Sequence, residues 1–520
     1  MRKSILLLSL ILAVSTACTT ADPKESAVSL HPMADLNQNL EETEAEDPYW
    51  TTYEVFLYSY YDTNGDGIGD INGLTEKLDY ISDMGFNAIW MMPIHPSPSY
   101  HKYDVMDYKD IDPVYGTMED FDKLEKACEE KGIRLIMDLV INHTSSQHPW
   151  FLEAVDALRN NYESKYINYY RFSDSAQDGY AQVPDTNIYY EARFWHGMPD
   201  LNLDSPDVRN EILDIVSFWK EKGIDGFRLD AVTSYYTGRD SENIAFLQWL
   251  KENTDTYYVA EAWTNQETYG SYYASGLDSF FDFAFGDQKG VISGTVSGSY
   301  GADDYISAQI KEQQLFSSYN PNAVNAPFYT NHDMARGAGY YAGDDGSKTK
   351  MALGLNLLMS GNAFLYYGDE LGMKGSGKDE NKRAPMYWSD GGEGMCKGPE
   401  DMDEVNMKFP SLEEQEKDEY SIYQYVKQAV HIRNAFKEIM QGEVEEIPSL
   451  MNEEASAYLK KYGDSSVLIA LNTADQAEEL DLSGTGYGNL AAMLIVNDQP
   501  VVLKDGKITL PPYAIAVVQP

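Results

Sequence analysis

Ionisable side chains stand at or near the ends of several short apolar runs in this sequence. The runs are IRLIMDLVI (133–141), GFRLDAV (226–232), YYVAEAW (257–263) and APFYTNHD (326–333). The side chains are Asp138, His143, Arg228, Asp230, Glu261, His332 and Asp333. Gathering carboxylates at one place disfavours stability, because like charges repel and burying a charge is costly. We therefore expect these residues to serve chemistry rather than packing.

Two carboxylates with a charged helper suit the cleavage of a glycosidic bond. One acid attacks or stabilises the anomeric carbon, and the other protonates the departing oxygen and later activates water. An arginine beside the attacking acid keeps that acid ionised. If about 5 to 5.5 Å separates the two carboxyl groups, the configuration of the sugar is retained.

The elements that position these residues follow a strand–loop–helix alternation that begins near Tyr49. Further apolar runs lie at 53–61, 87–94 and 363–370, and helical patterns occur at 70–85 and 118–132. This alternation predicts an α/β fold, a (β/α)₈ TIM barrel, in which the carboxyl ends of the strands form the active-site face. The alternative is a doubly wound open sheet. No glycine-rich phosphate loop follows the first run, which counts against its nucleotide-binding forms.

The chain divides into segments of different character. The barrel is predicted at 49–143 and 201–440, and residues 144–200, rich in Tyr, Asn, Asp and Ser, form an inserted loop subdomain. Short apolar runs separated by turn residues predict a small antiparallel β-sandwich domain at 445–520.

The N-terminal 17 residues have the pattern of a signal peptide. Arg2 and Lys3 precede a short apolar run at 4–14, which is too short to span a bilayer, and small residues lead to Cys18. A cysteine at that place resembles a bacterial lipoprotein processing site, so Cys18 is the predicted lipidation residue. Residues 18–48 are acidic and without aromatic residues, which predicts a flexible tether. We expect lipid anchoring to the bacterial membrane at the cell surface, with plain secretion as the alternative.

Net charge limits the partners of the protein. The chain has 39 Lys and Arg against 84 Asp and Glu, a formal charge of −45. Such a surface repels phosphate backbones, which argues against nucleic acid, whereas a neutral carbohydrate is indifferent to it. Cys128 and Cys396 show neither a disulfide framework nor metal-ligand spacing. A monomer is expected.

Four strings resemble, in order, the four short conserved regions of the α-amylase family of glycoside hydrolases. They are DLVINHT (138–144), GFRLDAV (226–232), EAW (261–263) and NHD (331–333). The resemblance extends from about residue 49 to the end of the chain, and it implies roles for the three acids. Asp230 is the expected nucleophile, Glu261 the general acid/base and Asp333 the residue that stabilises the transition state.

The same resemblance implies a set of substrate-binding residues. Tyr103, in HKYDV, matches the ring that stacks on the cleaved sugar, and Arg383, in RAPMYW, resembles an arginine near the same subsite. Asp138 has two open readings, organising the end of its strand or contacting the substrate directly. The full expected set is Tyr103, His143, Arg228, His332, Asp104 and Arg383.

Residues near the nucleophile bear on the linkage and length of the substrate. The string MPDLN (198–202) resembles the form found in a group intermediate between oligo-1,6-glucosidases and neopullulanases. Ala231 follows the nucleophile, where strict α-1,6 cleavers carry valine. Thr233 and Ser234 replace the Lys-His pair with which many α-amylases hold the outgoing chain.

The resemblance therefore implies a retaining hydrolase of α-1,4 bonds in starch or malto-oligosaccharides. Alternatives are an oligosaccharide α-glucosidase, including α-1,6 cleavage, or a transglycosylase with the same three acids. A non-catalytic glucan-binding barrel is the alternative from another class of function. Such a protein is expected to lack one of the three carboxylates, and all three are present here.

A second site follows the first apolar run. The string DTNGDGIGD (62–70) places oxygen ligands at alternating positions, with glycine at the sixth, as in the first part of an EF-hand loop. Gly73 stands where the loop's final glutamate belongs, so an EF-hand helix pair is not expected. Relatives in the resembled family carry a calcium loop at this place. The prediction is structural Ca²⁺ bound by Asp62, Asn64, Asp66, the carbonyl of Ile68, and Asp70; an Asx-rich turn without an ion is the alternative.

Overall fold

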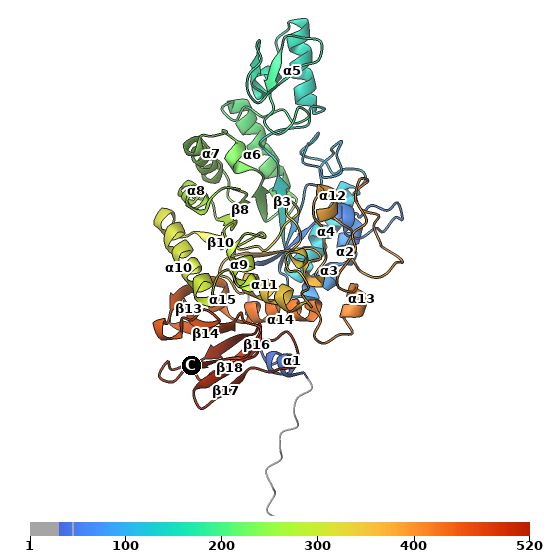
Figure 1. Ribbon diagram of the computed structural model, residues 1–520. Helices are drawn as coiled ribbons and strands as arrows, with labels where there is room; N and C mark the ends of the chain where they lie inside the picture. Colours follow the sequence, from blue (N-terminus) through green and yellow to red (C-terminus); the bar gives the residue numbers. More distant parts are fainter. Residues whose placement is uncertain (1–30, 44–45) are drawn as a thin grey trace, which may run out of the picture.

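The computed structural model describes residues 31–43 and 46–520, and its centre is a barrel of eight parallel strands (Figure 1). The strand order is β10-β9-β8-β7-β3-β2-β1-β11, and a bridge between Phe328 and Phe364 connects the two end segments. The strands are β1 (Thr51–Val55), β2 (Ala88–Met91), β3 (Arg134–Leu139), β7 (Gly226–Leu229), β8 (Tyr257–Ala260), β9 (Ser279–Phe281), β10 (Val324–Ala326) and β11 (Ala363–Tyr366). The predicted (β/α)₈ barrel is confirmed.

Helices surround the barrel, and their ends follow local sequence signals. In α4, Thr117 and Asp120 form a reciprocal capping box, and Gly132 ends the helix with a φ of 68°. The main helices are α2 (Ile71–Glu76), α3 (Leu78–Asp83), α4 (Met118–Lys131), α6 (Pro206–Glu221), α7 (Asp240–Asn253), α8 (Gln266–Tyr272), α9 (Val291–Ser297), α10 (Ala302–Tyr319), α11 (Ser347–Leu357) and α14 (Ile422–Ala435). Shorter ones are α12 (Asp379–Lys382), α13 (Leu412–Gln415) and α15 (Lys437–Gln441).

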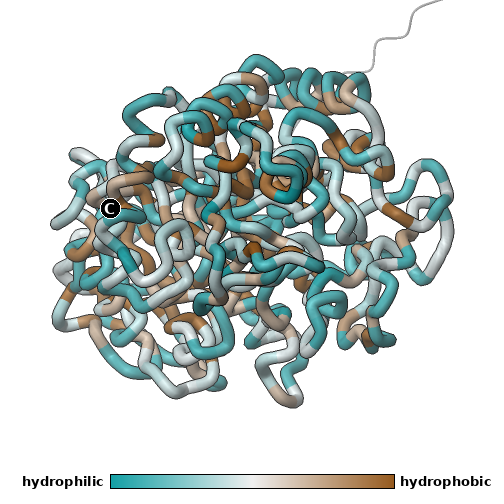
Figure 2. Tube along the Cα trace, turned by 90° about the horizontal axis from the view of Figure 1, so that it is seen from above, coloured by the Kyte–Doolittle hydropathy of each residue, from teal (hydrophilic) through white to brown (hydrophobic). Residues whose placement is uncertain are grey.

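The inside of the barrel forms an apolar core of its own. Seen from above, many hydrophobic segments lie within the surrounding helices and loops (Figure 2). The interior cluster contains Trp50, Ala88, Trp90, Ile136, Tyr257, Val259, Phe281, Ala326, Phe328, Met334 and Phe364. Residues two apart on a strand share a face. The same inward alternation therefore places Glu54 after Trp50, and Asp138 after Ile136, near the carboxyl ends of their strands.

An inserted subdomain follows β3 and extends away from the barrel (Figure 1). It contains α5 (Pro149–Asn160) and a small antiparallel sheet in the order β4-β6-β5. The sheet strands are β4 (Phe172–Ser173), β5 (Tyr180–Gln182) and β6 (Tyr189–Glu191). A bridge between His143 and Asp200 joins its two ends, and a second bridge joins Tyr170 to Leu201, so the subdomain returns to the barrel beside His143.

The C-terminal domain consists of two antiparallel sheets at the end of the molecule opposite α5 (Figure 1). One has the order β12-β13-β14-β19-β16 and the other β15-β18-β17. The strands are β12 (Glu443–Glu446), β13 (Ala455–Tyr462), β14 (Ser465–Asn472), β15 (Glu478–Asp481), β16 (Asn489–Leu494), β17 (Val502–Lys504), β18 (Lys507–Leu510) and β19 (Ile515–Gln519).

Part of the predicted flexible tether is packed on the protein, so that prediction is wrong for this part. Helix α1 (Pro32–Asn37) contacts β16 and α14, and its Asn37 side chain exchanges hydrogen bonds of 3.0 and 3.1 Å with the Met493 backbone. Met33 and Leu36, three residues apart on the helix, and Leu40 just beyond its end explain the packing, because these apolar side chains pack into or against the core.

The predicted signal peptide and Cys18 lie outside the described residues. Within residues 31–43 and 46–520, helices fall short of the length and apolar character needed to cross a membrane.

Candidate active site at the carboxyl ends of the barrel strands

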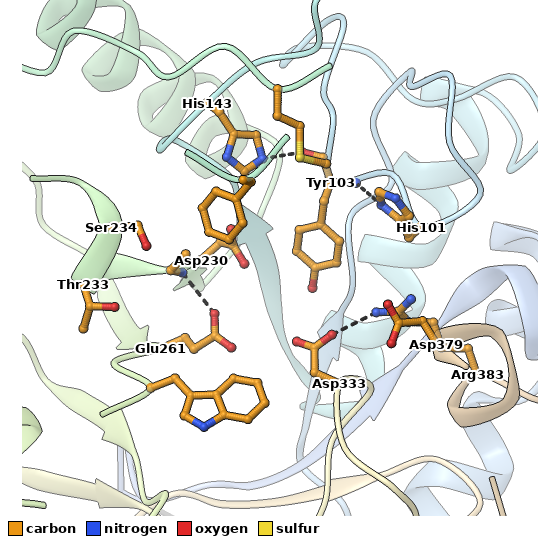
Figure 3. A pocket seen from close by; sticks show the side chains of 14 residues that line it. His101, Tyr103, His143, Asp230, Thr233, Ser234, Glu261, Asp333, Asp379 and Arg383 are labelled. Atoms are coloured by element: carbon orange, nitrogen blue, oxygen red, sulfur yellow. Dashed lines mark hydrogen bonds and ion pairs between the residues drawn. The ribbon is translucent and has the colours of Figure 1, made fainter. Parts of the chain in front are cut away.

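A cavity of about 580 Å³ opens at the carboxyl ends of the barrel strands (Figure 3). It brings together six of the residues predicted from the sequence: Tyr103, His143, Asp230, Glu261, Asp333 and Arg383. The other lining residues are His101, Phe194, Met198, Ala231, Thr233, Ser234, Trp263 and Asp379. Figure 3 shows Asp230, Glu261 and Asp333 pointing into this space from three different elements.

One arginine connects the acids. Arg228 in β7 is buried, and its Nη1 lies 2.7 Å from Asp230 Oδ1 and 3.0 Å from Asp138 Oδ1. Its Nη2 lies 2.8 Å from Glu261 Oε2. Burial alone lowers the pKa of a guanidinium, but these carboxylates hold the pKa of Arg228 well above its usual value. Asp138 and Arg228 are adjacent in the register of β3 and β7, so the sheet itself builds the pair.

Asp230 projects from a sharp turn just after β7. The next residue, Ala231, has a φ of 48°, a left-handed conformation that costs energy for a residue with a Cβ. The Ala231 amide donates a 3.0 Å hydrogen bond to Glu261 Oε2. The turn therefore places the Asp230 carboxylate and the Glu261 carboxyl on the same side of the cavity.

Glu261 follows β8 and has the environment of a proton donor. Its pKa is raised to about 7: burial is the main cause, the charges of Asp230 and Asp333 add to it, and Arg228 opposes them. A carboxyl with this pKa carries its proton in a large fraction of molecules near neutral pH, whereas an ordinary glutamate does not.

Asp333 is held as a carboxylate by two cations. Arg383 Nη2 lies 2.9 Å from its Oδ1, and His332 Nε2 lies 3.1 Å from its Oδ2. Burial raises the pKa of Asp333, but His332 and Arg383 bring it well below its usual range. Asp333 therefore offers fixed, charged acceptors to groups in the cavity.

Tyr103 and His143 form another part of the cavity wall. The Tyr103 ring stacks on the His332 ring at 5.6 Å, and its hydroxyl lies 2.8 Å from His332 Nε2. His143 Nε2 lies 3.2 Å from the Tyr103 carbonyl oxygen, and burial lowers the pKa of His143, which favours its neutral form. A flat ring beside neutral hydrogen-bonding groups suits the C–H face of a sugar.

Two predicted binding residues, Arg228 and His332, are buried and contact the lining acids from outside the cavity. Asp104 is placed differently. It accepts a 2.7 Å hydrogen bond from Ser97 Oγ and another from Ser99 Oγ, and it is not among the lining residues. It organises its own loop.

Several site residues were missed by the sequence reasoning. Glu54 in β1 is buried and lies 2.6 Å from His332 Nδ1; its signal was a lone acid inside an apolar run. Phe194 and Trp263 line the cavity yet are 51% and 53% exposed, so their rings face an open cleft. Trp263 stands two residues after Glu261, a position that the strand-end reasoning reached but did not use. Asp379 carried no local signal.

The loop at 62–70 is built from acidic and amide side chains that accept backbone hydrogen bonds. Asp62 accepts from the amides of Asn64, Gly65 and Gly67, Asn64 from that of Asp66, and Asp66 from that of Ile68. Asp70 accepts from Gly73 N and Thr63, and so begins α2. The predicted ligands are absent from the cavity wall.

The donor chemistry of this loop fits a hard cation, because each predicted ligand offers an oxygen atom. Across residues 31–43 and 46–520, however, no three or more His, Cys, Asp or Glu side chains form a group that could hold a metal ion. Two of the predicted ligands are of other kinds: the side-chain amide of Asn64 and the backbone carbonyl of Ile68.

Comparisons with known proteins agree over most of the chain. The model of the alpha amylase catalytic domain matches residues 54–442, and that of the maltogenic amylase C-terminal domain matches residues 449–517. Alpha-amylase 3 of Dictyoglomus thermophilum is 36% identical, over 90% of this chain and 92% of that protein. The probable oligo-1,6-glucosidase 3 of Bacillus subtilis is 30% identical, over 81% and 89%. The solved structure of Eubacterium rectale Amy13B has a TM-score of 0.92 and 45% identity, covering 94% of this chain and 99% of that one.

Proposed function

Because this chain belongs to the alpha-amylase family of glycoside hydrolases, we propose that it cleaves α-1,4-glucosidic bonds of starch or malto-oligosaccharides with retention of configuration. The observation that carries the proposal is the shared arginine. Arg228 contacts both Asp230 and Glu261, and burial is the main cause that raises the pKa of Glu261 to about 7. One acid is thus suited to attack and the other to donate a proton.

The proposed reaction has two steps. Asp230 attacks the anomeric carbon, the bond to the leaving oxygen breaks, and Glu261 gives its proton to that oxygen. Water then attacks the glucosyl–Asp230 ester, Glu261 takes a proton from that water, and the sugar leaves with its original configuration. Asp333 accepts hydrogen bonds from the sugar hydroxyls, while Tyr103 covers the C–H face of the ring.

The cavity beyond the acids supports short chains as well as starch. Thr233 and Ser234 line it with small neutral hydroxyls, and Trp263 stacks on Phe283 at 5.2 Å with its outer face exposed. Exposed aromatic faces hold sugar rings without requiring a long chain. An oligosaccharide α-glucosidase, including α-1,6 cleavage, or a transglycosylase is the second candidate, favoured by the similarity to a probable oligo-1,6-glucosidase.

Product analysis tests this proposal. The purified enzyme is given starch, pullulan, maltotriose and isomaltose, with the Asp230→Asn variant as the inactive control. We expect loss of the starch–iodine colour, release of short maltooligosaccharides, and slow or absent cleavage of isomaltose. Glucose released only from chain ends, without loss of iodine colour, would favour the second candidate.

Two further proposals concern the periphery of the chain. The 62–70 loop binds structural Ca²⁺ through Asp62, Asn64, Asp66, the Ile68 carbonyl and Asp70, supported by its all-oxygen donor set. Cys18 carries a lipid that anchors the protein to the outside of a bacterial membrane, supported by the N-terminal sequence pattern. Metabolic labelling with a radioactive fatty acid tests the anchor; label retained in a Cys18→Ser variant would contradict it.

A further inference from the structure

Glu54 is a buried acid inside the barrel with no part in the reaction proposed above. It lies on β1 in register with Trp90 of β2 and Tyr366 of β11, and only 1% of its surface is exposed. An ionised carboxylate among aromatic rings is costly unless it is paired. Its partner is His332, whose Nδ1 lies 2.6 Å from Glu54 Oε1.

The contacts of His332 determine where its protons lie. Nδ1 faces the Glu54 carboxylate, and Nε2 faces the Asp333 carboxylate at 3.1 Å. The Tyr103 hydroxyl is the other neighbour of Nε2, at 2.8 Å, and it lies 3.0 Å from Asp138 Oδ2, to which it can donate its proton. Each ring nitrogen thus faces a carboxylate oxygen, an arrangement that favours a proton on both nitrogens.

We propose that Glu54 is a positioning residue that holds His332 as a doubly protonated imidazolium, which in turn keeps Asp333 charged and correctly oriented towards the substrate. Only the expected effect on catalysis rests on the proposed function; the protonation of His332 does not. Glu54 itself lies outside the cavity wall and acts through His332.

The surrounding charges are consistent with this role. The charged or titratable groups that act on Glu54 are His332, Asp333, Arg228, Tyr366 and Asp369. Burial raises the pKa of Glu54, and His332 and Arg228 oppose that rise. Burial lowers the pKa of His332, but Asp333 and Glu54 overcome this and raise it to about 9.

The first test needs no substrate. Enzyme labelled with ¹⁵N in its eight histidines is titrated by NMR, and a His332→Asn variant assigns the His332 signals. We expect both His332 nitrogens to be protonated from pH 6 to beyond pH 8. A neutral His332 ring at pH 7 would overturn the proposal, even if the enzyme cleaves starch as proposed.

The second test changes Glu54 to Gln, which keeps the shape of the side chain but removes its charge. His332 then loses its proton near neutral pH, and the bare Nε2 faces the Asp333 carboxylate. We expect kcat/KM to fall about 10- to 100-fold at pH 7.5. As the pH falls, the ratio of the variant's kcat/KM to that of the wild type should recover towards one. An unchanged ratio with an unchanged His332 titration would contradict the role; a loss equal at every pH would indicate structural damage and also count against it.

Two controls make the second test specific. Glu312→Gln makes the same side-chain change at another buried acid, one held by Gln266 and Asn325 outside the cavity wall, and should leave activity and the His332 titration unchanged. The double variant Glu54→Gln/His332→Asn should lose no more activity than His332→Asn alone, because Glu54 acts through the imidazole. If the activity losses of the two single variants multiply in the double variant, Glu54 does not act through His332. If Glu54→Gln does not fold, the wild-type titration decides alone.

Discussion

Two fully buried arginines lie at opposite ends of the same barrel, and their partners differ. Arg228, at the carboxyl end, contacts Asp138, Asp230 and Glu261. Arg433, at the amino end, donates to Thr51 Oγ1 at 3.1 Å and to the carbonyls of Leu357, Met359 and Gly361. Carboxylates hold the pKa of Arg228 well above its usual value, whereas burial lowers that of Arg433 to about 9.

The difference separates what the fold requires from what the reaction requires. The amino end joins strands and helix α14 through an arginine that donates to carbonyl and hydroxyl oxygens. The carboxyl end is not forced by the barrel to gather acids, and doing so is costly. The cluster around Arg228 is therefore kept for chemistry, in agreement with the general placement of active sites in this fold.

Of the changes at the carboxyl end, removal of the attacking acid should lower activity the most. Asp230→Asn keeps the shape of the side chain but removes the nucleophile, so kcat should fall on the order of 10⁴-fold or more, with little change in the affinity for maltotriose. Stopped assays on maltotriose and calorimetric binding measure the two quantities. Activity within 10-fold of wild type would remove Asp230 from its proposed role.

Exchanging each arginine for methionine breaks the comparison directly. Arg228→Met leaves three acids without their shared cation, and it should lower activity by at least 10²-fold and the free energy of unfolding by about 3–5 kcal/mol. Arg433→Met leaves carbonyls unpaired, and it should cost a similar amount of stability with kcat of the folded enzyme within about twofold. Equal losses of kcat in both variants would show that the two ends do not differ in function.

The third prediction concerns Glu261 and pH. Wild-type kcat/KM should fall above about pH 7, the pKa to which burial raises Glu261; Glu261→Gln should lower activity about 10²- to 10⁴-fold and remove that limb. A raised folded-state pKa means that ionising Glu261 costs stability as pH rises from about 4, its unfolded value, to about 7. Glu261→Gln should therefore stabilise the fold by about 1–3 kcal/mol at pH 8 and by nothing near pH 4. Destabilisation at pH 8 would contradict the assigned environment.

The smallest effect on activity is expected at the 62–70 loop. Chelation should lower Tm by a few degrees, and Ca²⁺ should restore it, because an ion bound only to the folded state stabilises it by mass action. The initial rate of the folded enzyme should stay within about twofold. Asp66→Asn, which keeps the Asx turn, should show a reduced response to Ca²⁺. An identical Tm with and without chelator would leave the loop as a turn without an ion.

Strand and helix patterns were enough to predict the fold and the acids at the strand ends. Asp230, Glu261 and Asp333 lie beyond the carboxyl ends of their strands, and Asp138 lies near the carboxyl end of β3, so topology brings them together. Strand β9 (Ser279–Phe281) is short and was not among the predicted runs. Helix α1 was missed because its acidic surroundings concealed the apolar pair Met33 and Leu36 and the nearby Leu40.

Contacts between distant segments could not be predicted. Glu54 and His332 are 278 residues apart in the sequence. Glu54 lies on β1 and His332 follows β10, and these segments come together only because the barrel closes. The direction of the Asp104 side chain depends on Ser97 and Ser99 in its own loop, which motif matching does not consider. Local spacing thus predicts candidate side chains for the chemistry, whereas three-dimensional closure determines which side chains contact them.

The most direct test of the proposed mechanism is to trap its covalent intermediate. A fluorinated α-glucosyl fluoride slows the second step more than the first, and mass spectrometry of peptides then identifies the labelled residue. The mechanism predicts one glucosyl group on Asp230, and an α-configured first product when maltotriose hydrolysis is followed by NMR. A label on another residue, or a first product of β configuration, would contradict it.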